Sequence, residues 1–139
     1  MRIIGLDVGT KTIGVAISDP LGLTAQGVKT IYRKGLEADM NAVDALIREF
    51  GADEIMIGLP LNMNGSSGPS VEMAKNFGEE IEKRHPIKIT YRDERYSTMA
   101  ATRILLEGDI SRKKRKAVID KMAAAYVLQG YLDYLRNKG

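Results

Sequence analysis

The chain has 139 residues, 44% of them hydrophobic and 28% charged, which is typical of one folded domain and excludes a disordered polymer. It contains no cysteine, which excludes disulfides and cysteine-ligated zinc, and no apolar run approaches the roughly 18 residues of a membrane helix. The net charge of +3 permits a polyanionic partner without requiring one. We therefore expect a single cytoplasmic domain over residues 1–139 that does not enter a membrane.

The N-terminal part of the chain predicts three strands. Residues 2–8 and 12–18 are two apolar runs, and the turn sequence Gly9-Thr10-Lys11 between them predicts a hairpin. A second turn follows at residues 19–22, which read Asp-Pro-Leu-Gly. A weaker third strand is then expected over residues 25–32.

The hydrophobic period changes to that of a helix after the third strand. Apolar residues at i, i+3, i+4 and i+7 mark one helical face, namely Val43, Leu46, Ile47 and Phe50. Gly51 follows them and predicts the end of the helix. Residues 54–59 are a short apolar run suited to a buried parallel strand.

The remaining elements are expected in alternation. Residues 60–69 form a glycine- and serine-rich loop, and an apolar stripe over residues 71–81 marks a second helix. A fifth strand is expected at 87–92, a helix from an N-cap at Ser97 to about residue 107, and a last helix over about 116–137. Three antiparallel strands followed by parallel crossovers predict an α/β fold with a five-stranded mixed sheet flanked by helices.

Asp7 and Asp120 are acids at positions where apolar residues are expected. Asp7 lies inside the first apolar strand, where a carboxylate must be paired, protonated or bound to a cation. Asp120 continues the apolar face of the last helix, which is formed by Ala123, Ala124, Val127 and Tyr131. The alternatives are that Asp7 caps the following turn and that Asp120 is a first-turn acid favoured by the helix dipole.

Asp93 and Glu94 close the fifth strand, and strand alternation sends them to opposite faces of the sheet. One of them can therefore join Asp7 and Asp120, while the other pairs with a neighbouring arginine. If three acids converge, they form an all-oxygen site suited to Mg²⁺ or Mn²⁺. Two such ions about 4 Å apart would activate a water molecule against a phosphodiester.

Several residues are candidates for contacts with nucleic acid. Five consecutive cations predict binding to a phosphate backbone, because the release of counterions favours clustered charge. The alternative is a solvated basic loop or helix start. The five residues are Arg112, Lys113, Lys114, Arg115 and Lys116. Lys11 lies among Gly5, Gly9 and Gly14, which permit either close approach of a phosphate or a tight hairpin with positive φ.

Two further segments offer polar contacts. Asn62 and Asn64 in the loop after the fourth strand can donate and accept hydrogen bonds near a strand end. Arg95 can clamp a phosphate bidentately or pair with Asp93 instead.

Four stretches of the chain together resemble the YqgF family. The first runs from Ile4 to Ala16 and contains Asp7 followed by Val-Gly-Thr-Lys; the others are residues 58–65, 93–98 and 119–125. Members of that family are described as pre-16S ribosomal RNA nucleases and as Holliday junction resolvases. The resemblance implies an RNase H-like fold related to the RuvC resolvase.

The resemblance also implies roles for individual residues. It makes Asp7, Glu94 and Asp120 the catalytic metal ligands, with Asp93 as the competitor of Glu94. The loop departs from the family pattern, because Asn64 stands where an aspartate often precedes the glycine. A catalytic role for that position is therefore not expected here.

These observations lead to one principal hypothesis and three alternatives. The principal one is a divalent-metal nuclease that trims the 5′ end of precursor 16S ribosomal RNA. A Holliday junction resolvase is the alternative within the same class, and it would require a dimer rather than a monomer. An ATP-binding protein is the second alternative, because the Asp-Val-Gly-Thr stretch after Leu6 is also similar to the phosphate loop of ATP-binding proteins with this fold. The third alternative is a non-catalytic module that binds nucleic acid through the basic cluster alone.

Overall fold

The computed structural model describes residues 2–59, 68–93 and 112–138, with the side chains of residues 112–119 and 138 outside the description. Five strands form one sheet: β1 (Ile3–Val8), β2 (Thr12–Ser18), β3 (Ala25–Tyr32), β4 (Glu54–Leu59) and β5 (Lys88–Asp93). Three helices are described: α1 (Leu36–Phe50), α2 (Pro69–Arg84) and α4 (Arg112–Lys138). This confirms the expected order of elements within the described ranges.

The sheet has the strand order β3-β2-β1-β4-β5. The pairs β1–β2 and β2–β3 are antiparallel, and Asp7 lies opposite Gly14 in the first of them. The pairs β1–β4 and β4–β5 are parallel. The predicted mixed sheet of three antiparallel strands followed by parallel crossovers is therefore confirmed.

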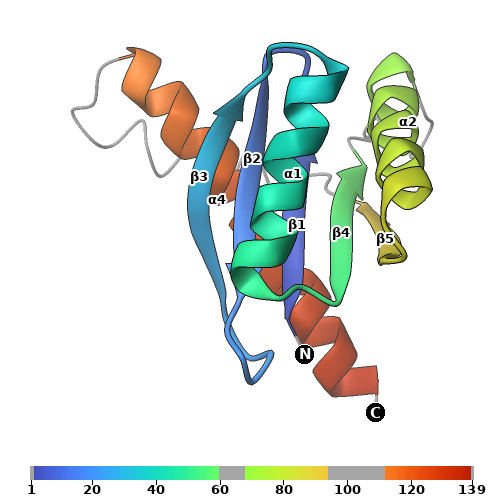
Figure 1. Ribbon diagram of the computed structural model, residues 1–139. Helices are drawn as coiled ribbons and strands as arrows, with labels where there is room; N and C mark the ends of the chain where they lie inside the picture. The colour runs from blue at the N-terminus through green and yellow to red at the C-terminus, as the bar shows by residue number, and fades with distance from the viewer. Residues whose placement is uncertain (1, 60–67, 94–111, 139) are drawn as a thin grey trace.

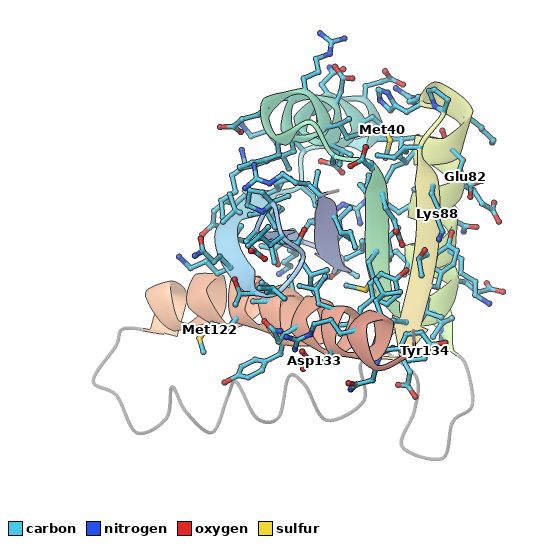
Figure 2. The ribbon with its side chains drawn as sticks, turned by 90° about the horizontal axis from the view of Figure 1, so that it is seen from below. Met40, Glu82, Lys88, Met122, Asp133 and Tyr134 are labelled. Atoms are coloured by element: carbon cyan, nitrogen blue, oxygen red, sulfur yellow. The ribbon has the colours of Figure 1, made fainter. Side chains whose placement is uncertain are left out.

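The helices form layers on the two faces of the sheet. Helices α1 and α2 pack on one face, whereas α4 crosses the opposite face and contacts all five strands (Figure 1). In Figure 2 Met40 lies on the α1 side, and Met122, Asp133 and Tyr134 lie along α4 on the far side of the sheet. Among the described residues, no helix is both long and apolar enough to cross a lipid bilayer.

Strand alternation assigns each side chain to one of these two layers. Ile4, Leu6 and Val8 of β1 belong to the core under α1 and α2. Ile3 belongs to the second core, under α4. The intervening Gly5 faces the same helix, where a Cβ atom would come within 3.0 Å of Leu128 Cβ. Asp7, two residues later, therefore also lies on the α4 face.

Glycine in the β1–β2 hairpin serves close packing rather than an unusual backbone conformation. The described glycines with positive φ are Gly22, Gly35 and Gly51, so the positive-φ alternative for the hairpin glycines is wrong. At Gly14 a Cβ atom would overlap the backbone carbonyl oxygen of Asp120. The small residue is required because α4 passes directly over β2 at this point.

Helix α4 begins at Arg112, earlier than the expected start near residue 116. The five consecutive cations are therefore helical in backbone, which accords with the good helix propensity of lysine and arginine. The helix expected from Ser97 lies outside the described residues, as do residues 60–67 of the loop expected at 60–69. Gly68 is the N-cap of α2, and Pro69 is its first residue.

Candidate active site

The candidate site lies at the edge of the sheet formed by the carboxyl ends of the parallel strands. Strands β1, β4 and β5 run in the same direction and end at Val8, Leu59 and Asp93. In open α/β sheets, ligands commonly bind outside the carboxyl ends of the strands. Asp7 is the penultimate residue of β1 at this edge, and it is half-buried on the α4 face.

Asp120 reaches the same region from α4. Its carboxylate oxygen Oδ2 accepts a hydrogen bond of 2.6 Å from the Thr12 hydroxyl. Its backbone carbonyl lies against Gly14, which is the register partner of Asp7. Helix α4 therefore brings Asp120 over the hairpin that carries Asp7, and both acids lie on one side of the sheet.

Asp93 lies on the other side of the sheet. Its register partner Leu59 packs against the core of α1 and α2, whereas Arg92 lies beside Gly130 of α4 and 5.5 Å from the ring centre of Tyr134. Alternation therefore turns Asp93 away from Asp7, and its side chain is exposed. Glu94, the other candidate, lies outside the described residues and stays a prediction.

The turn after β1 is held by contacts that the sequence did not reveal. The Arg33 guanidinium donates to the Gly9 carbonyl at 2.8 Å and forms a 2.9 Å ion pair with Asp39, which is 1% exposed. The Arg33 backbone N–H donates to the Lys11 carbonyl at 2.9 Å. These contacts fix the backbone at Lys11, whose side chain is exposed beside the candidate site.

The remaining candidate residues are distributed as follows. The backbone of Arg112, Lys113, Lys114, Arg115 and Lys116 forms the first turns of α4, and their side chains are outside the description. Asn62, Asn64 and Arg95 lie outside the described residues. In the chain, Asn62 and Asn64 follow β4 and Arg95 follows β5, and both strands end at the edge of the sheet where Asp7 lies.

The donor chemistry of the site fits a divalent cation. Asp7 and Asp120 are two carboxylates from different elements, and hard oxygen ligands of this kind suit Mg²⁺ or Mn²⁺. Within the described ranges, no group of three or more acidic, histidine or cysteine side chains could hold a metal ion. A third ligand would thus come from outside these ranges, where Glu94 lies.

Thr12 is the site residue that sequence reasoning missed. The α4-facing positions of β2 are all small or hydroxyl-bearing, namely Thr12, Gly14, Ala16 and Ser18. Such a face indicates close contact with another element, but it does not identify that element as the helix carrying Asp120. The burial of Asp39 could not be predicted from the sequence, because an acid in the first turn of a helix is usually exposed.

Solved structures share this architecture at low sequence identity. The chain resembles T. thermophilus RuvC in complex with a Holliday junction substrate with a TM-score of 0.64 and 13% identity, over 99% of this chain and 96% of that one. It resembles the Fowlpox virus resolvase in complex with Holliday junction DNA with a TM-score of 0.56 and 14% identity, over 97% and 99% of the two chains. The fold is therefore RNase H-like, as expected.

Sequence comparison then defines the family. A protein of Moorella thermoacetica is 54% identical over 139 residues, covering 100% of this chain and 99% of the relative. One of Clostridium perfringens is 58% identical over 133 residues, covering 96% and 97%. Both carry the name "Putative pre-16S rRNA nuclease". The chain belongs to the RuvX family, described as Holliday junction resolvase, whose model matches residues 1–134, and this confirms the resemblance to YqgF proteins.

Proposed function

We propose that this protein is a divalent-metal-dependent nuclease that processes the 5′ end of pre-16S ribosomal RNA. The observation that carries the proposal is the convergence of Asp7 and Asp120 on one face of an RNase H-like sheet. The names of relatives more than half identical to this chain support RNA as the substrate.

Asp7, Glu94 and Asp120 would hold the metal ions. The orientation of Asp93 toward the opposite face favours Glu94 as the third ligand, because adjacent strand residues alternate. Divalent ions held there would supply activation of a water molecule and stabilisation of charge on the leaving oxygen of a phosphodiester. The chain's own contribution is to hold the carboxylates: β1 holds Asp7 through the sheet, and α4 carries Asp120 over the same hairpin, where it accepts a hydrogen bond from Thr12.

The N-terminal part of α4 would hold the substrate backbone. Residues 112–119 precede the point at which Asp120 meets β2, and at about 1.5 Å per residue they extend the helix by roughly 12 Å. Figure 1 shows this part of α4, in orange, projecting past the edge strand β3. The run from Arg112 to Lys116 would then contact phosphates on the side of the sheet that bears Asp7, with Lys11, Asn62, Asn64 and Arg95 as further contacts at the strand ends.

A side-by-side cleavage assay tests the choice of substrate. Purified protein is offered precursor 16S ribosomal RNA and a four-way DNA junction in equal amounts, with Mg²⁺ and with Mn²⁺. We expect cleavage of the RNA near the mature 5′ end and loss of cleavage when the metal is chelated. Binding without cleavage of either substrate would support the non-catalytic module instead, and tight binding of ATP with Mg²⁺ in a calorimetric titration would support the ATP-binding alternative.

The site assignment is tested by Asp7→Asn and Asp120→Asn. Each change keeps the side-chain shape but removes a charged oxygen ligand, so we expect cleavage to fall by at least about a hundredfold while the far-ultraviolet circular dichroism is unchanged. Asp133→Asn is the matched control, because Asp133 lies on the same helix and pairs with Arg136 at the surface. An Asp7→Asn protein that cleaves RNA at the wild-type rate would show that the site lies elsewhere.

Resolution of branched DNA is the second candidate function, favoured by the description of the matching family. Symmetric cleavage of a four-way junction requires two active sites, so this function predicts a homodimer. Light scattering with and without the junction distinguishes a monomer from a dimer. A monomer that cleaves RNA and leaves the junction intact would exclude this candidate.

A further inference from the structure

Thr12 lies between the two elements that carry Asp7 and Asp120. It is the first residue of β2 and is 6% exposed. Its hydroxyl donates the 2.6 Å hydrogen bond to Asp120 Oδ2 across 108 residues of sequence. Through this contact a strand residue restrains a carboxylate on a distant helix.

The backbone of Thr12 is itself held firmly. Its carbonyl oxygen accepts a 2.8 Å hydrogen bond from the Gly9 N–H, which closes the turn after β1. On the other side, Thr12 pairs with Tyr32 in the β2–β3 ladder. Because the sheet and the turn both constrain Thr12, its hydroxyl is a fixed point against which the Asp120 carboxylate is oriented.

The chemistry of the donor suits a metal-binding carboxylate. A threonine hydroxyl is a neutral donor, so it restrains one oxygen without cancelling the negative charge that attracts a cation. A lysine or arginine in the same place would compete with that cation. The hydrogen bond from Thr12 involves Oδ2 alone, so it does not occupy the second carboxylate oxygen, Oδ1.

We propose that Thr12 is a positioning residue that orients the Asp120 carboxylate for metal binding. The inference rests on the function proposed above, in which Asp120 is a metal ligand. Residues that orient metal ligands by hydrogen bonding typically change metal affinity or activity by about 10- to 100-fold when they are replaced. A purely structural role, in which Thr12 only docks α4 on the hairpin, would change stability and leave the affinity for metal unaltered.

The test compares Thr12→Val with Thr12→Ser. Valine keeps the β-branched shape and the strand propensity but loses the hydroxyl, whereas serine keeps the hydroxyl and loses only a methyl group. Mn²⁺ is titrated into each protein without nucleic acid and followed by electron paramagnetic resonance. Thermal unfolding without metal is measured in parallel, and kcat and KM for RNA cleavage are determined separately.

We expect Thr12→Val to bind Mn²⁺ about 10- to 100-fold more weakly and to lose kcat rather than KM, with Thr12→Ser close to wild type. Wild-type Mn²⁺ affinity in Thr12→Val would overturn the proposal, whatever happens to stability. Equal weakening in both variants would also overturn it, because the hydroxyl would then not be the cause. Thr12→Ala serves in place of Thr12→Val should the latter not fold.

An Asp120→Asn protein separates this inference from the proposed function. If Asp120→Asn binds Mn²⁺ weakly and Thr12→Val binds it normally, only the role of Thr12 is wrong. If Asp120→Asn binds Mn²⁺ as tightly as wild type, the assignment of Asp120 as a ligand is wrong.

Discussion

Gly14 shows at the scale of a single residue how the site depends on the absence of a side chain. A Cβ atom at this position would overlap the Asp120 carbonyl oxygen, which belongs to helix backbone and cannot rotate away. The close approach of α4 to β2 is the same contact that brings Asp120 over the hairpin carrying Asp7. The packing of α4 on β2 and the position of Asp120 in the candidate site therefore both require glycine at position 14.

We predict that Gly14→Ala destabilises the protein by about 1–3 kcal/mol, since an added methyl group in a packed contact forces the backbone to shift. Urea denaturation measures this change. Cleavage should also fall, because α4 must move away from β2 and carries Asp120 with it. A Gly14→Ala protein with wild-type stability would show that α4 does not pack on β2 as described.

Gly130 provides the matched control, because alanine at this position should raise stability where alanine at position 14 lowers it. It lies inside α4, and the nearest atoms to a Cβ there belong to the Arg92 side chain at 3.7 Å, an ordinary contact distance. Alanine in a helix interior is favoured over glycine by about 1 kcal/mol. Gly130→Ala should therefore stabilise the protein in the same denaturation experiment.

At the scale of elements, a buried polar cluster fixes the C-terminal half of α4 on the sheet. Glu54, the first residue of β4, is 3% exposed. Its Oε2 atom accepts hydrogen bonds of 2.6 Å from the Thr90 hydroxyl and of 2.6 Å from the Tyr131 hydroxyl. The cluster joins β4, β5 and α4 at the end of the sheet opposite to the candidate site.

This cluster predicts a dependence of stability on alkaline pH. Burial, followed by the hydrogen bond to Glu54, raises the pKa of Tyr131 above its usual value of 10.0. Tyr131 therefore contributes stability that is fully present below that value and is lost as pH rises toward the folded-state pKa, because the unfolded chain ionises first. The free energy of unfolding of the wild type should fall above about pH 10.

Tyr131→Phe tests this prediction. At neutral pH the variant should lose about 1–3 kcal/mol of stability, because one donor to a buried carboxylate is removed. At alkaline pH its stability should fall less steeply than that of the wild type. Tyr126→Phe, on the exposed side of the same helix, is the control. Parallel pH profiles for wild type and Tyr131→Phe would contradict the assigned role.

The elements themselves were predictable from sequence because their signals are local. Short apolar runs and turn residues indicated the strands, and the apolar stripe before Gly51 indicated α1. The left-handed C-cap at Gly51 confirms the predicted stop. The face of α4 was also predictable, since Ala123, Ala124 and Val127 are buried beside Asp120. The Thr12–Asp120 hydrogen bond could not be predicted from the sequence, because the distance between these two residues depends on how α4 crosses the sheet.

At the scale of the whole molecule, charge is divided between the two faces of the sheet. Helix α4 contains eight basic and two acidic residues, a net charge of +6. Helices α1 and α2 together contain four basic and eight acidic residues, a net charge of −4. The overall charge of +3 conceals this asymmetry. A polyanion should therefore approach the α4 side, where Asp7 and Asp120 lie.

The division of charge predicts which cations control the binding of nucleic acid. The triple variant Arg112→Gln, Lys113→Gln and Lys114→Gln removes three charges from α4. A control triple, Arg48→Gln, Lys75→Gln and Lys83→Gln, removes three from the α1 and α2 side, so both proteins have the same net charge. Affinity for a labelled four-way DNA junction is measured by fluorescence anisotropy in a metal chelator between about 50 and 200 mM salt.

We expect the α4 variant to bind more weakly and to show a shallower dependence of log affinity on log salt, by about 0.9 for each phosphate that is no longer neutralised. The control variant should keep the wild-type slope, because its charges lie across the sheet from the proposed substrate path. Equal slopes for the two variants would mean that total charge, rather than the position of α4, governs binding. The α4 variant should also cleave RNA with a raised KM and a nearly unchanged kcat, since the proposed role of these cations is to hold the substrate backbone, whereas Asp7 and Asp120 are left intact.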